Sequence, residues 1–323
     1  MTEPPKHKAR RLALRTVGGH FILGCFMCKL KKALTYDEQV DRLEQFHSLT
    51  VNDRSRAIEI LKSVNYYRLS GYGIGLKEPT DKEKYKKGIS LDFLYSLYLF
   101  DSNLRNILIH TIEYIEIQFR SRIAYFLANK YGAEGYMDLV NFTDKRLKDG
   151  SSVHSNIINN LKEEFERQKN SPFVKHHMNQ YNGHFPIWVS VELFTFGNLA
   201  SLFSIMKEED KKAIAKLYKT SHSFLISWIL SLVETRNICA HYGRLYNALL
   251  KQAPALLAKH KIYRQRLNKL FPVILVIKYV LYNKPDIWNE FYRKLSDLIT
   301  SNLSIINLSF MGFPTNWDEI LTA

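Results

Sequence analysis

Cysteine is scarce in this chain, with three residues, Cys25, Cys28 and Cys239, among 323. So few thiols cannot build a disulfide framework, which argues against a disulfide-stabilised secreted domain and favours a reducing cytoplasm. Long apolar runs are missing as well. The nearest, residues 17–28, contains three glycines and falls short of the roughly 20 residues that a membrane span needs. This run follows several arginines but lacks a small-residue cleavage site, so we expect a cytoplasmic protein without a signal peptide or membrane segment.

Several enzyme signatures are also missing. The sequence contains no glycine-rich phosphate loop, no HExxH and no GxSxG, which argues against a P-loop nucleotide hydrolase, a zinc protease and an α/β-hydrolase. Cys25 and Cys28 form a lone CxxC with His20 nearby. A zinc site needs four ligands, and this segment offers no obvious fourth. We therefore expect unreactive thiols there, no metal site and no cofactor.

The charge balance, by contrast, is strongly positive. Lys and Arg number 46 against 31 Asp and Glu, a formal net charge of +15. Such a surplus favours a polyanionic partner, most commonly nucleic acid, with a solvated basic surface as the alternative.

Residues 1–32 differ from the rest in composition and carry eight Lys and Arg against one acid, which is +7 of the +15. We expect this arm to be disordered or an over-extended start, with Met27 as the biological first residue. The competing interpretation is a basic tail that grips RNA, although its apolar run 21–23 does not suit such a tail. No internal repeat or clear linker interrupts residues 33–323, which we expect to form a single all-α domain.

The helical pattern dominates the sequence, because the period-2 alternation that marks β-strands is nearly absent. Thr35 and Glu38 form a capping box for a helix that runs to about His47. Apolar residues at intervals of three and four predict a long amphipathic helix over 90–131, closed by Gly132. The aromatic and glycine-rich segment 65–73 is predicted to be a connector and 77–87 an exposed loop. Further helices are predicted over 53–63, 156–168, 187–206, 209–218, 223–250, 264–281 and 286–299.

One short pattern stands out on these helices. Arg-Asn followed by three residues and His occurs twice, at 236–241 and at 105–110. At about 100° per residue, Arg236 falls within the apolar stripe of its helix, whereas Arg105 and His110 flank theirs. A guanidinium on a core-facing stripe is costly unless it is paired or at work. The later pattern is therefore the candidate active site, and a structural ion pair to a carboxylate of another helix is the alternative.

The residue types of the later pattern suit cleavage of RNA by its own 2′-hydroxyl. His241 can carry a proton in either direction near neutral pH. Arg236 keeps its charge and can grip two oxygens of the crowded phosphoryl group. Asn237 can orient the histidine or the phosphate. This chemistry requires no metal ion.

Residues 236–241 resemble the Arg-x4–6-His signature of HEPN ribonucleases. The wider segment 234–247 (ETRNICAHYGRLYN) is similar to abortive-infection proteins of the AbiD/AbiF type. Three further stretches share that similarity: 63–72 (SVNYYRLSGY), 100–125 (FDxxLR and IEYIEIQFRSRIAY) and 311–317 (MGFPTNW). The resemblance spans roughly residues 33–320.

The resemblance implies a HEPN-type helical bundle with additional helices and a phage-defence toxin, a metal-independent endoribonuclease that leaves a 2′,3′-cyclic phosphate. It implies RNA as substrate, a structured noncoding RNA as inhibitor in some members and, because HEPN sites combine two Arg/His pairs, a homodimer. The alternative is a protein that binds a structured noncoding RNA without cleaving it. A HEPN helper that binds another protein would not need both Arg236 and His241. Positions expected to bind RNA or support the site are Arg105, His110, Arg120, Arg68, Arg244 and Tyr246.

Overall fold

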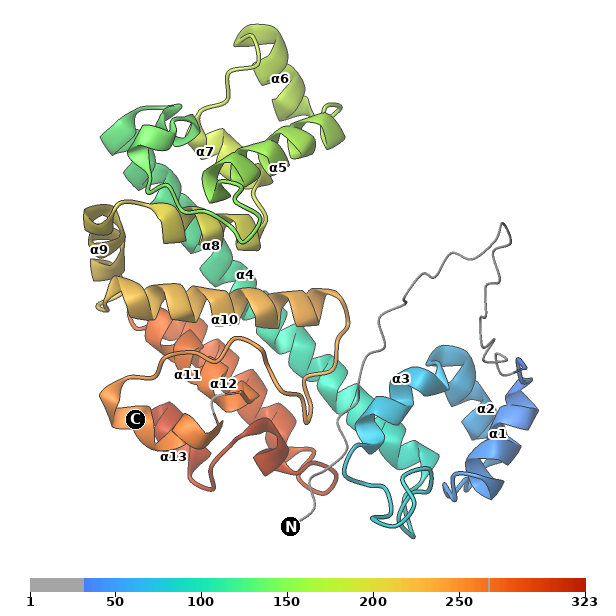
Figure 1. The fold of residues 1–323 in the computed structure, drawn as a ribbon. Helices are drawn as coiled ribbons and strands as arrows, with labels where there is room; N and C mark the ends of the chain where they lie inside the picture. Colours follow the sequence, from blue (N-terminus) through green and yellow to red (C-terminus); the bar gives the residue numbers. More distant parts are fainter. Residues whose placement is uncertain (1–31, 267) are drawn as a thin grey trace, which may run out of the picture.

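The structure is a computed structural model that describes residues 32–266 and 268–323. In that part of the chain it contains thirteen α-helices, several short 3₁₀ turns and no β-strand, which confirms the predicted all-α fold (Figure 1). The CxxC pair, Met27 and nearly all of the basic arm lie outside the described residues. The helices are α1 (Tyr36–Gln45), α2 (Arg54–Ser63), α3 (Tyr66–Ser70), α4 (Leu91–Tyr131), α5 (Val153–Arg167), α6 (Pro172–Gln180), α7 (Ile187–Ser190), α8 (Phe196–Ile205), α9 (Glu208–Lys216), α10 (His222–Ala240), α11 (Leu270–Val280), α12 (Pro285–Thr300) and α13 (Trp317–Thr322).

The 41-residue helix α4 is the axis of the molecule and is about 60 Å long at about 1.5 Å per residue. Ser90 caps its first turn by accepting the backbone N–H of Phe93, and Gly132, with a φ of 81°, ends it as predicted. One face of α4 is buried from Leu91 to Leu127, because different helices cover different stretches. Helices α8, α10 and α12 pack against it, α2 and α3 cover its beginning, and α7 covers its end.

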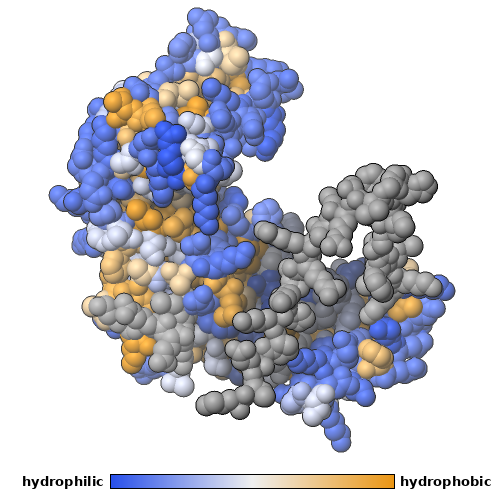
Figure 2. Space-filling model, viewed as in Figure 1, coloured by the Kyte–Doolittle hydropathy of each residue, from blue (hydrophilic) through white to orange (hydrophobic). Residues whose placement is uncertain are grey.

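The two ends of α4 carry separate groups of helices, with α5–α7 at one end and α1–α3 at the other (Figure 1). This arrangement leaves a hollow side between the two ends, and apolar residues gather near its middle (Figure 2). Buried apolar side chains form a smaller cluster from α1, α2 and the start of α4, and a larger cluster over the rest. Leu76 and Tyr98 pack against both clusters. That residues 33–323 are one domain stays a prediction.

The segments before α4 give the sequence predictions mixed outcomes. The capping box of Thr35 and Glu38 is confirmed, and segment 77–87 contains no helix. The predicted connector over 65–73 is wrong, because this segment forms α3 and a 3₁₀ turn over Gly71–Gly73. The side chain of Asn65 starts α3 by accepting the backbone N–H of Tyr67, and the buried side chain of Leu69 holds the short helix in place.

The single helix predicted over 187–206 is broken in two. Helix α7 leads into a 3₁₀ turn over Val191–Leu193, and α8 starts only after the side chain of Thr195 caps it. The carbonyls of Val191 and Phe194 accept hydrogen bonds from the guanidinium of Arg120 on α4. A continuous helix would use these carbonyls for its own ladder and leave buried Arg120 without them.

Helices α6 and α13 are not predicted from the sequence; they are short, with 9 and 6 residues. Helix α11 begins at Leu270 and not near 264, because a 3₁₀ stretch occupies Ala258–Arg266. Across the described ranges, no helix combines the length and the apolar character needed to cross a membrane.

Candidate functional site

Helix α10 ends sooner than predicted, at Ala240 and not near residue 250. His241 is its C-cap, with its backbone N–H bonded to the carbonyl of Asn237. The chain then turns at Tyr242, whose φ of 56° lies in the left-handed region. Asn237 and His241 are both exposed. The candidate histidine therefore lies at the solvent-exposed C-terminal end of a helix.

Arg236 lies at the edge of the buried stripe of α10, with 38% of its side chain exposed, and not in the middle of the stripe. The prediction failed because Thr235 and Cys239 are also buried, which turns the centre of the buried face about 60° away from Arg236. Nε of Arg236 lies 3.4 Å from Oε2 of Glu116 on α4, and Nη1 donates to Oδ1 of Asn237 over 3.4 Å. The ion pair to another helix, considered as the alternative, is thus present.

Glu116 joins two arginines from its buried position on α4. Its Oε1 accepts from Nη2 of Arg120 over 2.6 Å, while its Oε2 faces Arg236. Arg120 is buried as well and donates to the carbonyl of Phe194 over 2.8 Å. Arg120 therefore anchors the carboxylate from the inside, and the carboxylate holds one side of Arg236 at the surface. The remaining N–H groups of Arg236 can meet a ligand.

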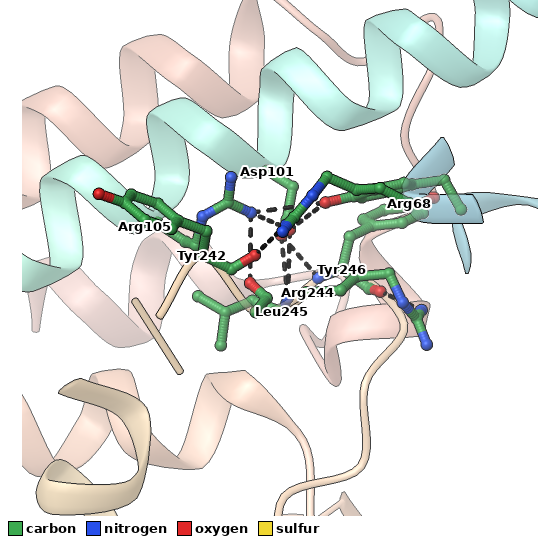
Figure 3. A network of polar contacts seen from close by, with 9 residues as sticks. Arg68, Asp101, Arg105, Tyr242, Arg244, Leu245 and Tyr246 are labelled. Carbon is green, nitrogen blue, oxygen red and sulfur yellow. Dashed lines mark hydrogen bonds and ion pairs between the residues drawn. The ribbon is translucent and has the colours of Figure 1, made fainter. Parts of the chain in front are cut away.

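A second buried carboxylate, Asp101 on α4, holds the loop that follows α10 (Figure 3). It accepts the backbone N–H of Tyr246 over 2.7 Å and that of Leu245 over 3.2 Å. It also accepts Nη1 of Arg105 over 2.6 Å and the hydroxyl of Tyr72 over 2.8 Å. Burial raises the pKa of the Asp101 carboxyl group, and the donors of Tyr72 and Arg105 act in the opposite direction. We call these five residues the Asp101 clamp.

Further contacts tie the loop 241–247 to its surroundings. Arg105 also donates to the carbonyl of Gly243 over 3.3 Å, and exposed Arg68 on α3 donates to the carbonyl of Tyr242 over 2.5 Å. Arg244 donates to the carbonyl two residues ahead over 2.6 Å. These bonds fix the backbone directly after the candidate histidine, while its imidazole stays exposed.

Tyr246 is a packing residue beneath this loop. It is buried, its hydroxyl accepts the backbone N–H of Asn307 over 2.9 Å, and its ring lies 6.0 Å from that of Phe100. Its placement favours support of the loop over contact with a ligand.

A sequence model of the Abi-like protein family matches residues 59–247, more than half of the chain. The chain belongs to this family. Membership indicates a role in abortive infection. No match to this Abi-like protein is found among curated proteins or among solved structures.

The family match contains every residue of the Asp101 clamp. Three of the four stretches that carry the resemblance meet there in space: 63–72 supplies Tyr72, 100–125 supplies Asp101 and Arg105, and 234–247 supplies the loop. The fourth stretch, 311–317, lies outside the match and packs in the core, where the ring of Phe313 lies 5.0 Å from that of Phe271. In this Abi-like protein the clamp therefore joins the family-like segments to the end of α10.

The prediction for the earlier pattern of this Abi-like protein, residues 105–110, is wrong at Arg105 and agrees with the structure at His110, which lies off the buried stripe. Arg105, expected on the flank of its helix, is 4% exposed and belongs to the clamp. His110 is exposed and lines a small cavity with Glu290 and Lys294 of α12. It points about 120° around α4 from Glu116. The structure thus brings Arg105 to the candidate site and places His110 elsewhere.

Sequence reasoning missed the two carboxylates that support the site, Asp101 and Glu116. Each stands four residues before an arginine on α4, a spacing that puts acid and base on one helix face. Both pairs lie among apolar residues of the stretch 100–125. An acid and an arginine at this spacing within an apolar helix are the signal that would reveal them.

The groups at the end of α10 are an imidazole, a guanidinium and an amide. The guanidinium and the amide can bind phosphate oxygens. The imidazole can do so as well and can also transfer protons near neutral pH. Burial raises the pKa of the neighbouring Cys239 thiol to about 12, so it stays protonated at neutral pH. Within 32–266 and 268–323, no group of three or more His, Cys, Asp or Glu residues is placed to hold a metal ion.

Proposed function

We propose that this Abi-like protein is a metal-independent HEPN endoribonuclease of the AbiD/AbiF type that acts as an abortive-infection toxin. The observation that carries the proposal is the open end of α10, where exposed His241 and half-exposed Arg236 stand on elements held by two buried carboxylates. Catalytic groups need such support, because a misplacement of about 1 Å can cost about a hundredfold in rate. The net charge of +15 suits RNA as the substrate.

In the proposed reaction, the 2′-oxygen of RNA bonds to the neighbouring phosphorus and the bond from phosphorus to the 5′-oxygen breaks. A neutral imidazole takes the proton of the 2′-hydroxyl, and an imidazolium gives a proton to the leaving 5′-oxygen. Arg236 binds the non-bridging oxygens, whose negative charge is concentrated in the transition state. Asn237 orients the guanidinium to which it is bonded. The products are a 2′,3′-cyclic phosphate and a 5′-hydroxyl.

One chain supplies one His241, whereas this reaction uses two proton-transfer groups. We therefore propose a homodimer in which two α10 ends meet and each supplies an imidazole. The outer face of α10 provides a contact surface, since Asn237 and His241 lie within about 20° of Leu230 around the helix. Leu230 is 38% exposed, an apolar residue that a second chain can cover.

Incubation of the purified protein with labelled RNA in excess chelator tests the proposal. The wild type should leave 2′,3′-cyclic phosphate ends, and His241→Ala should lower the cleavage rate by at least about a hundredfold. His110→Ala is the matched control, because it removes an exposed imidazole from the second copy of the pattern. In a bacterial host, His241→Ala should likewise abolish the toxicity of expression.

Two outcomes contradict the proposal. Cleavage that persists undiminished in well-folded His241→Ala protein removes the catalytic assignment. Activity that disappears with chelator and returns with magnesium removes the metal-independent chemistry.

The ion pair between Arg236 and Glu116 favours a second candidate function, a protein that holds a structured noncoding RNA without cutting it. A guanidinium engaged by a carboxylate contributes structure and a basic surface without any proton transfer. In that case the wild type binds the RNA and leaves it intact, and His241→Ala binds it equally well. Filter binding beside the cleavage assay distinguishes the two functions.

A further inference from the structure

A cavity of about 380 Å³ lies beside the first half of α10, away from the end that carries the candidate site. It is bounded by the residues just after α9, the first half of α10, the segment 257–259, the end of α11 and the beginning of α12. Trp228 lines it from α10, about 12 Å along the helix axis from Arg236. The proposed cleavage of RNA makes no use of this cavity.

Large aromatic rings form much of the cavity wall, among them those of Trp228, Tyr279, Tyr282 and Trp288. The rings of Trp228 and Tyr279 lie 5.1 Å apart, inclined by 38°. The indole N–H of Trp228 donates to the carbonyl of Ala255 over 2.7 Å, so its polar edge is already satisfied. The ring surface that remains for a ligand is therefore apolar, which favours binding of a planar aromatic group.

Of the residues that the structure describes, three lysines, Lys219, Lys259 and Lys278, line the same cavity, and no Asp or Glu does. Nζ of Lys219 lies 4.7 Å from the ring centre of Tyr282, which keeps this ammonium group against the wall. Nζ of Lys278 is held by the carbonyl of Leu321 over 2.8 Å. Burial lowers the pKa of Lys278, and the charge of Lys259 lowers it further. An anion in the cavity would relieve this repulsion between the lysines.

We propose that this cavity binds a small aromatic anion with the chemistry of a free mononucleotide, its ring against the aromatic wall and its phosphate among the three lysines. The volume of about 380 Å³ suits a ligand of that size. A neutral aromatic ligand would leave the lysines without a counter-charge, and a bare phosphate would leave the aromatic wall uncovered. The proposal goes beyond the proposed nuclease function and uses none of its residues.

Calorimetric titration of the full-length protein with AMP and UMP, and separately with adenosine and inorganic phosphate, tests the proposal. We expect one nucleotide per chain with a Kd on the order of 10–100 µM, and binding of adenosine and of phosphate at least about tenfold weaker. The double variant Lys219→Gln/Lys259→Gln should weaken AMP at least about tenfold and leave adenosine unchanged, because only the phosphate meets the lysines. Tyr282→Leu should weaken both AMP and adenosine.

The matched control is Lys148→Gln/Lys175→Gln, which removes the same charge from exposed positions outside the cavity and should leave AMP binding unchanged. The proposal is overturned if neither nucleotide saturates, if adenosine binds as tightly as AMP, or if both double variants weaken binding equally. His241→Ala separates this proposal from the nuclease. It should leave AMP affinity unchanged, so AMP binding that disappears with His241 belongs to the RNA site and overturns the assignment to the cavity.

Discussion

The pattern Arg-Asn-x3-His occurs on two helices of one chain, and the two copies occupy opposite environments. On α4, Arg105 is 4% exposed and its charge is met by Asp101. On α10, Arg236 is 38% exposed and shares Glu116 with Arg120. The histidine of the first copy faces α12, whereas that of the second caps a helix beside an anchored loop.

The two arginines differ in their hydrogen-bond partners. Nη1 of Arg105 donates to the buried carboxylate of Asp101, the hydroxyl of Tyr72 and the carbonyl of Gly243. Its role is therefore structural. Arg236 is held on one side by Glu116 and open on the other. The pattern by itself therefore does not distinguish the two copies; what distinguishes them is that Arg236 is both held by a carboxylate and accessible to solvent.

The largest effect on stability is expected at the Asp101 clamp. Asp101→Ala leaves Arg105 buried without its counter-charge and the N–H groups of Leu245 and Tyr246 without an acceptor. Loss of one partner of a buried pair typically costs about 3–5 kcal/mol of unfolding free energy, measured by urea denaturation. Asp92→Ala on the same helix is the control. Its side chain is 42% exposed and its Oδ1 lies 3.7 Å from Nε of Arg56, so its loss should cost less than about 1 kcal/mol.

If both aspartate variants lose the same stability, the clamp does not anchor the loop 241–247, and the distinction between the two patterns weakens. Protection of the loop amides from hydrogen exchange provides a second measurement. It should fall in Asp101→Ala and stay unchanged in Asp92→Ala.

The next effect concerns activity and not stability. Arg236→Lys keeps a positive charge at the edge of α10 but cannot bind two phosphate oxygens at once. We expect the RNA cleavage rate to fall by about a hundredfold or more, while the urea midpoint stays within error of the wild type. Arg105→Lys should show the reverse, a lower urea midpoint because lysine cannot serve Asp101, Tyr72 and Gly243 together. Equal loss of cleavage in two equally stable variants would contradict the separation of roles.

A smaller effect is expected at Glu116, which acts through Arg236 as a positioning residue. Glu116→Gln removes the charge that orients Arg236, so the cleavage rate should fall by roughly tenfold. RNA affinity should stay the same or increase, because a negative charge is lost next to the proposed phosphate site. A purely structural role would not separate rate from affinity in this way. A rate equal to that of the wild type would show that Glu116 does not position Arg236.

The sequence predicts well those parts of the fold that local signals define. Helix α4 begins after a serine cap and ends at a glycine with positive φ, and both signals can be read from neighbouring residues. The errors fall where distant side chains compete with the helix ladder. Arg120 takes two carbonyls and breaks the helix predicted over 187–206, and Asp101 takes two N–H groups beyond the end of α10.

For the candidate site, too, the local sequence predicts some features and contacts with distant residues determine the others. Arg236, Asn237 and His241 are candidates that the sequence proposes from their residue types and spacing. Their surroundings are not found, since Glu116 lies 120 positions before Arg236 in the chain and Asp101 lies 144 before Leu245. A helical wheel that counts apolar residues alone also misplaces Arg236, because it ignores the buried Thr235.

The smallest effect is expected at the second position of the two patterns. Oδ1 of Asn237 accepts a hydrogen bond from Arg236 over 3.4 Å at the surface, a long bond that contributes little to stability. Asn237→Ala should therefore lower the cleavage rate by roughly three- to tenfold, which corresponds to the loss of one modest hydrogen bond. Asn106→Ala, at the equivalent exposed position on α4, should leave cleavage unchanged because the arginine before it is already held in the clamp. Single-turnover cleavage assays of the two variants compare them directly. Equal rates in both would mean that Asn237 does not orient Arg236 and that the amide at the second position has the same passive role on both helices.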